Sequence, residues 1–297
     1  MAVSSNQFGN QTWRRWIGLL LLVAYSFAEE PFERVIAPSV TAIFNLPHMI
    51  PGVLLISRYA VFMLIRLVLD LAVAASIYLI LRPSPRGFPL RESKVTSRVF
   101  QGLLTGIVVM VAAIFMIVLI GSAHAAPSLQ SWRSAFAYGG GWLLSDFIGA
   151  AGEELFGRVA VLLVAERFVG RRGAMILSGL AFSLLHLGNP GATWIWLLRL
   201  FAQGVLLAYA VYRTSSVWWS VGYHTGWNWA SAPLFGAAGS GYLDQGHILD
   251  FTPTGSKWLT GGEVGPEGSV FAFVAVLAAF CLLMLVTPTK RELSEQY

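Results

Sequence analysis

Long apolar stretches recur along the chain, and short segments between them carry most of its charged residues. A helix that crosses a bilayer needs roughly 20 predominantly apolar residues. Eight stretches approach this length, at residues 13–28, 59–81, 99–121, 139–165, 173–187, 193–212, 217–237 and 269–286. The pattern therefore predicts an all-α fold, a polytopic transmembrane helical bundle of about eight spans.

Two further segments do not fit the pattern of simple spans. Residues 35–51 are apolar but contain Pro38, Pro47 and Pro51, which is typical of a re-entrant or interfacial piece. Residues 236–268 are long and rich in glycine. Long loops of this kind are often functional, so this one is either a cover over a site or a solvated connector.

The composition supports a membrane protein and argues against a soluble one. The chain has 297 residues, of which 56% are hydrophobic and only 12% are charged, whereas soluble domains are about 25% charged. Its one cysteine, Cys281, excludes a disulfide framework. The net charge of +5 is spread over short loops, which indicates membrane orientation and no nucleic-acid partner.

The basic residues gather on one side of the predicted bundle. They are Arg14, Arg15, Arg82, Arg86, Arg91, Lys94, Arg98, Arg167, Arg171, Arg172, Arg213, Lys290 and Arg291. The positive-inside rule makes this side cytoplasmic, so we expect a multi-pass protein of the cell membrane with both termini in the cytoplasm. The first stretch also fits a cleaved signal peptide, but an even span count favours a retained anchor.

Ionisable residues inside the apolar stretches are the strongest functional signal, because they are costly at membrane depth. Glu154 and Arg158 are four residues apart and are expected to form a pair on one helix face. Glu153 is then the freer carboxylate and a candidate base. Asp146, seven residues earlier, is expected to support it. The alternative is a network that only fixes the helix.

Histidines and an amide lie in the following stretches. His186 comes four residues after Phe182, which is expected to shape a pocket. His224 and Asn228 share a helix face, as donors to one developing negative charge would. Glu153, His186 and His224 also make an open zinc set in principle. Because no HExxH motif is present, the sequence requires no cofactor, while a divalent metal stays an alternative.

Two other pairs within the apolar stretches have the same four-residue spacing. Arg66 and Asp70 are expected to neutralise each other. Arg199 lies four residues before Gln203, which cannot neutralise it. We therefore expect Arg199 to face Asp146, a loop carbonyl or the candidate site.

The motifs EExxxR, FxxxH and HxxxN, on successive apolar segments, resemble the CAAX-protease and bacteriocin-processing (Abi) family, the type II CAAX prenyl endopeptidase group of intramembrane proteases. The resemblance covers roughly residues 139–286, including the stretch at 259–268. It implies a catalytic helical core in residues 135–287. The apolar pattern predicts N-terminal membrane helices in residues 1–134, about three spans with the proline-rich segment, and the charge pattern predicts a cytoplasmic tail in residues 288–297.

The resemblance also implies roles for the matching residues. The implied catalytic residues are Glu153, Glu154, His186, His224 and Asn228, and the supporting ones are Arg158, Phe182 and Asp146. Within this set, Glu153 resembles the base that activates water and His186 a second catalytic or water-positioning residue. His224 and Asn228 resemble the residues that stabilise the oxyanion. The family has been described both as metalloproteases and as metal-independent glutamate-dependent proteases.

The resemblance implies an intramembrane endopeptidase that takes a membrane-associated peptide or protein, prenylated or not, from the membrane or the cytoplasm. Two other functions remain open. One is a catalytically silent scaffold or immunity protein of the same fold. The other is a proton-coupled transporter that uses the acids and histidines as a relay; this is less favoured, because the chain lacks an inverted repeat.

Overall fold

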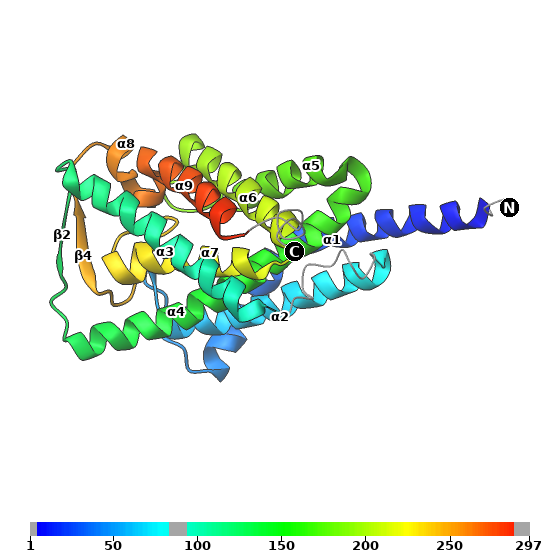
Figure 1. Ribbon diagram of the computed structural model, residues 1–297. Coiled ribbons are helices and arrows are strands. Elements are labelled where there is room, and N and C mark those ends of the chain that lie inside the picture. Colours follow the sequence, from blue (N-terminus) through cyan, green and yellow to red (C-terminus); the bar gives the residue numbers. More distant parts are fainter. Residues whose placement is uncertain (1–4, 83–93, 288–297) are drawn as a thin grey trace.

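The computed structural model describes residues 5–82 and 94–287, and in this part the chain is mostly helical (Figure 1). The helices are α1 (Ser5–Ile43), α2 (Ile56–Leu81), α3 (Val95–Leu119), α4 (Trp132–Glu154), α5 (Val161–Leu184), α6 (Trp194–Thr214), α7 (Trp218–Trp229), α8 (Lys257–Thr260) and α9 (Val270–Val286). The predicted all-α fold class is confirmed for these residues.

Short elements connect the helices. The π-helical segments η2 (Leu155–Ala160) and η3 (Ala230–Leu234) continue α4 and α7, and the 3₁₀ turns η4 (Gly262–Val264) and η5 (Pro266–Gly268) precede α9. Strand β1 (Val53–Leu54) pairs in parallel with β3 (Leu243–Asp244), and β2 (Ala123–Pro127) pairs antiparallel with β4 (Leu249–Pro253). The β2–β4 ribbon lies at the end of the bundle opposite the start of α1 (Figure 1).

Three helices in the described part are long and apolar enough to cross a membrane, namely α2, α3 and α6. Helix α9 is equally apolar but has only 17 residues. The total of about eight spans stays a prediction. Arg86, Arg91, Lys290, Arg291 and the predicted tail at residues 288–297 lie outside the described residues.

The predicted fourth and fifth spans lie within the helical run α4–η2–α5, which consists of two helices separated by a kink. The run turns at Gly170, whose φ of 68° and ψ of 178° lie in a region that glycine adopts without steric cost. The π-helical segment η2 contains Arg158 and directly follows Glu154. A π-bulge changes the direction of the side chains after it and is frequent at functional sites.

The proline-rich segment at residues 35–51 is helical in its first half. Helix α1 continues through Pro31 and Pro38 as far as Ile43, and non-helical backbone begins only at Phe44. Neighbouring helices and local adjustments make proline tolerable in membrane helices. The longer helix carries Glu29 into contact with α2, where Glu29 forms an ion pair with Arg66.

Helices α3 and α7 approach each other through two pairs of glycines. A Cβ atom on Gly102 or Gly106 would lie 2.1 or 2.2 Å from a backbone oxygen of α7, and one on Gly222 or Gly226 would lie 2.1 or 2.2 Å from a backbone oxygen of α3. Such Gly-xxx-Gly pairs allow the close backbone contact that drives helix association in membranes. This contact fixes α7, which carries His224.

Two large clusters of buried apolar residues stabilise the bundle. One lies toward the ends of the helices that carry Arg82, Arg167 and Arg213; it includes Ile77, Leu81, Val159, Leu162, Val164, Val211 and Val217. The other surrounds the α3–α7–α9 contact and includes Met110, Ile114, Leu207, Trp219 and Leu283. The space between α2, α4, α5 and α7 is not filled by these clusters, and the candidate site lies there.

Candidate active site

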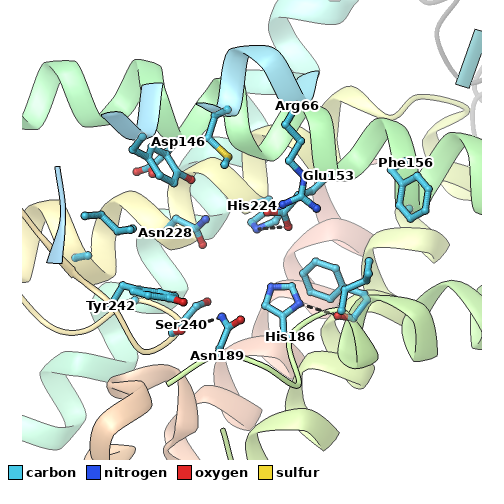
Figure 2. Close-up of a pocket in the computed structure, with 18 of the residues that line it drawn as sticks. Arg66, Asp146, Glu153, Phe156, His186, Asn189, His224, Asn228, Ser240 and Tyr242 are labelled. Carbon is cyan, nitrogen blue, oxygen red and sulfur yellow. Dashed lines mark hydrogen bonds and ion pairs between the residues drawn. The ribbon is translucent and has the colours of Figure 1, made fainter. Parts of the chain in front are cut away.

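A cavity of about 340 Å³ lies within the bundle, and the motif residues line it. Glu153 and Arg158 reach it from α4 and η2, His186 from the residues after α5, and His224 and Asn228 from α7. Figure 2 shows Glu153 and His224 on one wall and His186 on the opposite wall. The structure thus brings the three sequence motifs to one cavity.

A chain of charged contacts fixes His224. Arg158 Nε lies 3.1 Å from Glu154 Oε2, and both side chains are fully buried. The other oxygen of Glu154 accepts a hydrogen bond from His224 Nδ1 at 3.0 Å. The expected ion pair of Glu154 and Arg158 is present, and it also orients an imidazole. Because Nδ1 is used, Nε2 is the His224 nitrogen that remains for chemistry.

Glu153 lies beside this chain but is less engaged. One of its oxygens is 3.9 Å from His224 Nε2, and its side chain is 23% exposed, whereas that of Glu154 is fully buried. This contact is too long for a hydrogen bond, and the side chain of Glu153 forms no hydrogen bond with any of the described residues. It is therefore the carboxylate that can contact water in the cavity.

His186 faces Glu153 across the cavity (Figure 2). Its Nδ1 donates a hydrogen bond of 2.7 Å to the carbonyl oxygen of Phe182, one helical turn earlier. That bond fixes the tautomer and leaves Nε2 as an acceptor. Phe182 packs against both histidines, with ring-centroid distances of 4.8 Å to His186 and 5.6 Å to His224. It lies under the guanidinium of Arg158 at 4.5 Å.

Asp146 lines the cavity but does not contact Glu153. It is only 4% exposed, and none of the described residues forms a hydrogen bond with its Oδ2. It interacts electrostatically with Asp244 of β3, which lines the same cavity. Burial raises the pKa of Asp244 to about 8. No contact between Asp146 and Glu153 is present in the described part of the chain, and the supporting role of Asp146 stays a prediction.

Sequence reasoning did not assign Arg66 to the site. Arg66 lines the cavity close to Glu153 (Figure 2). Its Nε is 2.6 Å from Glu29 of α1 and 3.8 Å from Asp70, and Asp70 also accepts a hydrogen bond from Tyr25 at 2.8 Å. The predicted Arg66–Asp70 pair is thus the longer of two contacts. The missing signal was Glu29 on α1, because Glu29 lies just beyond the first predicted span at residues 13–28.

The glycine-rich segment at residues 236–268 covers one end of the cavity. Ser240, Tyr242 and Asp244 line the cavity from this segment, and Asn189 donates a hydrogen bond of 2.9 Å to the carbonyl oxygen of Ser240. Of the two alternatives for this loop, the structure favours a cover over the site.

Arg199 ties the same segment to α6. Its NH2 group lies 2.8 Å from Glu267 Oε2, its Nε donates 3.1 Å to the Glu267 carbonyl oxygen, and it also contacts Gln203. Ser240 donates to the same carboxylate at 3.2 Å. Of the partners expected for Arg199, the loop carbonyl is present, while the carboxylate beside it was not anticipated.

The alternative zinc set of Glu153, His186 and His224 does not fit a metal centre as these side chains lie. Zinc ligands converge on one point at about 2 Å. Among the described residues, no three His, Cys, Asp or Glu side chains converge in this way. We derive no step through a metal.

Comparison with known proteins supports the resemblance found from the motifs. The model of the family described as Type II CAAX prenyl endopeptidase Rce1-like matches residues 138–230, from α4 to the start of η3. This segment holds all three motifs, so the resemblance is confirmed there, and the match supports a CAAX-type intramembrane protease at the level of the family. The Abi name and metalloprotease chemistry lie outside the match. No curated protein and no solved structure matches the chain significantly.

Proposed function

We propose that this protein is an intramembrane endopeptidase in which Glu153 activates the water that attacks a peptide bond. One observation carries the proposal: Glu153, His186, His224 and Asn228 come from three separate helical segments and line one cavity. Glu154 is already neutralised by Arg158, whereas Glu153 is partly exposed to that cavity. A structural network would not need this additional carboxylate.

The chemistry follows from which atoms are free. Glu153 accepts a proton from water, and His186 Nε2, on the opposite wall, holds the water or accepts a hydrogen bond from it. The oxygen of the water bonds to the peptide carbonyl carbon, and the carbonyl oxygen gains negative charge. Asn228 and doubly protonated His224 donate hydrogen bonds to that oxyanion. Glu153 then returns the proton to the leaving amine, and the carbon–nitrogen bond breaks.

The route to the cavity is part of the proposal. The walls at one end come from β1, β3 and the segment at residues 236–268. Toward the arginine-bearing ends, the buried apolar cluster that includes Leu81, Val159 and Val217 lies between the cavity and the surface. With the orientation given by the basic residues, water and products exchange on the non-cytoplasmic side in this proposal, whereas the resemblance implied substrate entry from the membrane or the cytoplasm.

A peptide-cleavage assay with the full-length protein in lipid nanodiscs tests the proposal. The substrates are a farnesylated CAAX peptide and a mixed peptide library, and mass spectrometry identifies the products, with and without 1,10-phenanthroline. We expect cleavage of at least one peptide, at a rate that the chelator leaves unchanged. Failure to cleave any peptide would favour the silent scaffold, and loss of cleavage with the chelator would favour a metalloprotease.

The transporter alternative predicts a different result in the same preparation. A proton relay would move protons across liposomes in response to a substrate gradient. The endopeptidase predicts no such flux. A pH-sensitive dye inside the liposomes distinguishes the two functions.

A further inference from the structure

The cavity has a second group of acids that the proposed chemistry does not use. Asp146 and Asp244 both line the cavity, and Asp244 belongs to the segment at residues 236–268 that covers one end of it, called the loop cover below. Every other buried acid of the site has a cationic or donor partner: Glu154 has Arg158 and His224, and Glu29 has Arg66. Within the described residues, neither Asp146 nor Asp244 has one.

Asp146 shows that this end of the cavity is incomplete. Its side chain is 4% exposed and its Oδ2 has no hydrogen-bond partner among the described residues. A buried polar atom without a partner costs free energy, and two neighbouring carboxyl groups repel each other when both are ionised. A cationic group between them would remove both costs.

The surroundings fit an organic cation better than a metal ion. No three His, Cys, Asp or Glu side chains in the described part are arranged to hold a metal, and two carboxylates alone are a sparse set of ligands. Tyr59 and Tyr242 line the same region. Aromatic rings and carboxylates together suit the alkyl stem and charged head of a lysine or arginine side chain.

The distance between Asp146 and the proposed base Glu153 gives the position of the lysine or arginine residue on a substrate, relative to the scissile bond. Asp146 and Glu153 are seven residues apart on α4, which corresponds to about 10 Å along the helix axis. An extended peptide advances about 3.3–3.6 Å per residue. The distance therefore corresponds to roughly three residues from the scissile bond.

We propose that Asp146 and Asp244 form a specificity subsite that binds a lysine or arginine side chain of the substrate, about three residues from the bond that is cleaved. The claim that the bound side chain belongs to a substrate rests on the proposed endopeptidase function, whereas the binding of a cationic side chain does not. It also predicts that a free terminal carboxylate is disfavoured at this end of the cavity.

Equilibrium binding, measured apart from cleavage, tests the subsite. The probes are two fluorescein-labelled farnesylated peptides that differ only by lysine or norleucine three residues from the prenylated cysteine, and a second pair carries the change on the other side. Binding is measured by anisotropy with Glu153→Gln protein in nanodiscs. We expect at least one lysine peptide to bind about tenfold more tightly than its norleucine twin.

Three substitutions in the Glu153→Gln protein locate the preference. Asp146→Asn and Asp244→Asn each bring the lysine-to-norleucine ratio close to one, while Asp250→Asn, on β4 and outside the cavity lining, retains it. A ratio near one in the parent, or a preference that survives both cavity substitutions, overturns the subsite.

A cleavage assay with wild-type protein shows whether the subsite proposal and the endopeptidase proposal fail separately. A lysine preference in binding without cleavage of any peptide would support the subsite and contradict the endopeptidase. Cleavage of both twins with equal binding would support the endopeptidase and contradict the subsite.

Discussion

The two ends of the cavity treat buried charge in opposite ways. At the Glu153 end, Arg158, Glu154 and His224 form an unbroken series of contacts at 3.1 and 3.0 Å. At the other end, Asp146 and Asp244 are close together and lack a partner among the described residues. The first arrangement fixes side chains before a ligand arrives. The second leaves two carboxyl groups that a cationic ligand can pair with.

Removing the compensating charge at the Glu153 end should have the largest effect. Arg158→Met removes the guanidinium beside buried Glu154 and leaves His224 as its remaining partner among the described residues, and breaking a buried pair costs about 3–5 kcal/mol. We expect a strongly lowered thermal-unfolding midpoint and loss of peptide cleavage. Arg171→Met is the matched control, because Arg171 pairs with Glu166 at the surface and is 73% exposed; that change should be nearly neutral. Equal losses in the two variants would contradict the account.

A double variant separates stability from chemistry at the same position. Glu154→Gln with Arg158→Met removes both charges, so much of the unfolding free energy lost in the single variant should return. Cleavage should stay at least about tenfold low, because His224 Nδ1 no longer has a carboxylate to orient it. Recovery of full activity with stability would show that Glu154 has only a structural role.

The loop cover offers a second buried pair for the same comparison. Glu267→Gln leaves Arg199, which is fully buried, without its carboxylate, and we expect a loss of about 3 kcal/mol in unfolding free energy. Glu263→Gln is the control, because Glu263 is 73% exposed and 3.9 Å from Lys257. Limited proteolysis of residues 236–268 should accelerate only in the first variant. Similar protection in both would show that this ion pair does not fix the cover.

The glycine contact between α3 and α7 should have a smaller effect on stability. Gly106→Leu places a side chain against the backbone of α7, and overpacking of this kind costs about 1–3 kcal/mol. Because α7 carries His224, cleavage should fall with it. Gly140→Leu is the control, since open space surrounds Gly140. If thermal unfolding is unchanged in both variants, the contact does not position α7.

The acidic end should give the smallest effect, a dependence of peptide preference on pH. The pKa of Asp244 is raised to about 8, so this carboxyl group is mostly protonated at pH 7 and ionised above pH 8. The lysine-to-norleucine ratio in KM should therefore improve severalfold in favour of lysine between pH 7 and pH 9. The ratio should be flat in Asp244→Asn, and a flat ratio in the wild type would contradict the assignment.

The use of a ratio controls for the other ionisable groups that line the cavity. Apart from Asp146, which belongs to the subsite itself, those are Tyr59, Arg66, Glu153, Arg158, His186, His224 and Tyr242. Their titration affects both peptides, whereas the charge next to Asp244 differs only between lysine and norleucine. The ratio thus isolates the acidic end from the Glu153 end.

The contrast between these two ends also explains what could be predicted from the sequence. Glu154 and Arg158 are four residues apart on one helix, so local geometry was enough to pair them. The partners Asp146–Asp244, Arg66–Glu29 and Arg199–Glu267 are far apart in sequence, and only helix packing brings them together. Glu29 was missed because α1 continues beyond the predicted span, and Glu267 because a loop position has no periodicity to reveal its burial.

The most direct test of the central claim is the cleavage rate of Glu153→Gln protein, with Glu263→Gln as the matched control. Glutamine keeps the shape of the side chain but cannot accept the proton from water. In nanodiscs, with folding verified by thermal unfolding, we predict a kcat at least about a hundredfold below wild type for Glu153→Gln and an unchanged kcat for Glu263→Gln. A folded Glu153→Gln protein that cleaves peptides at the wild-type rate would contradict the account.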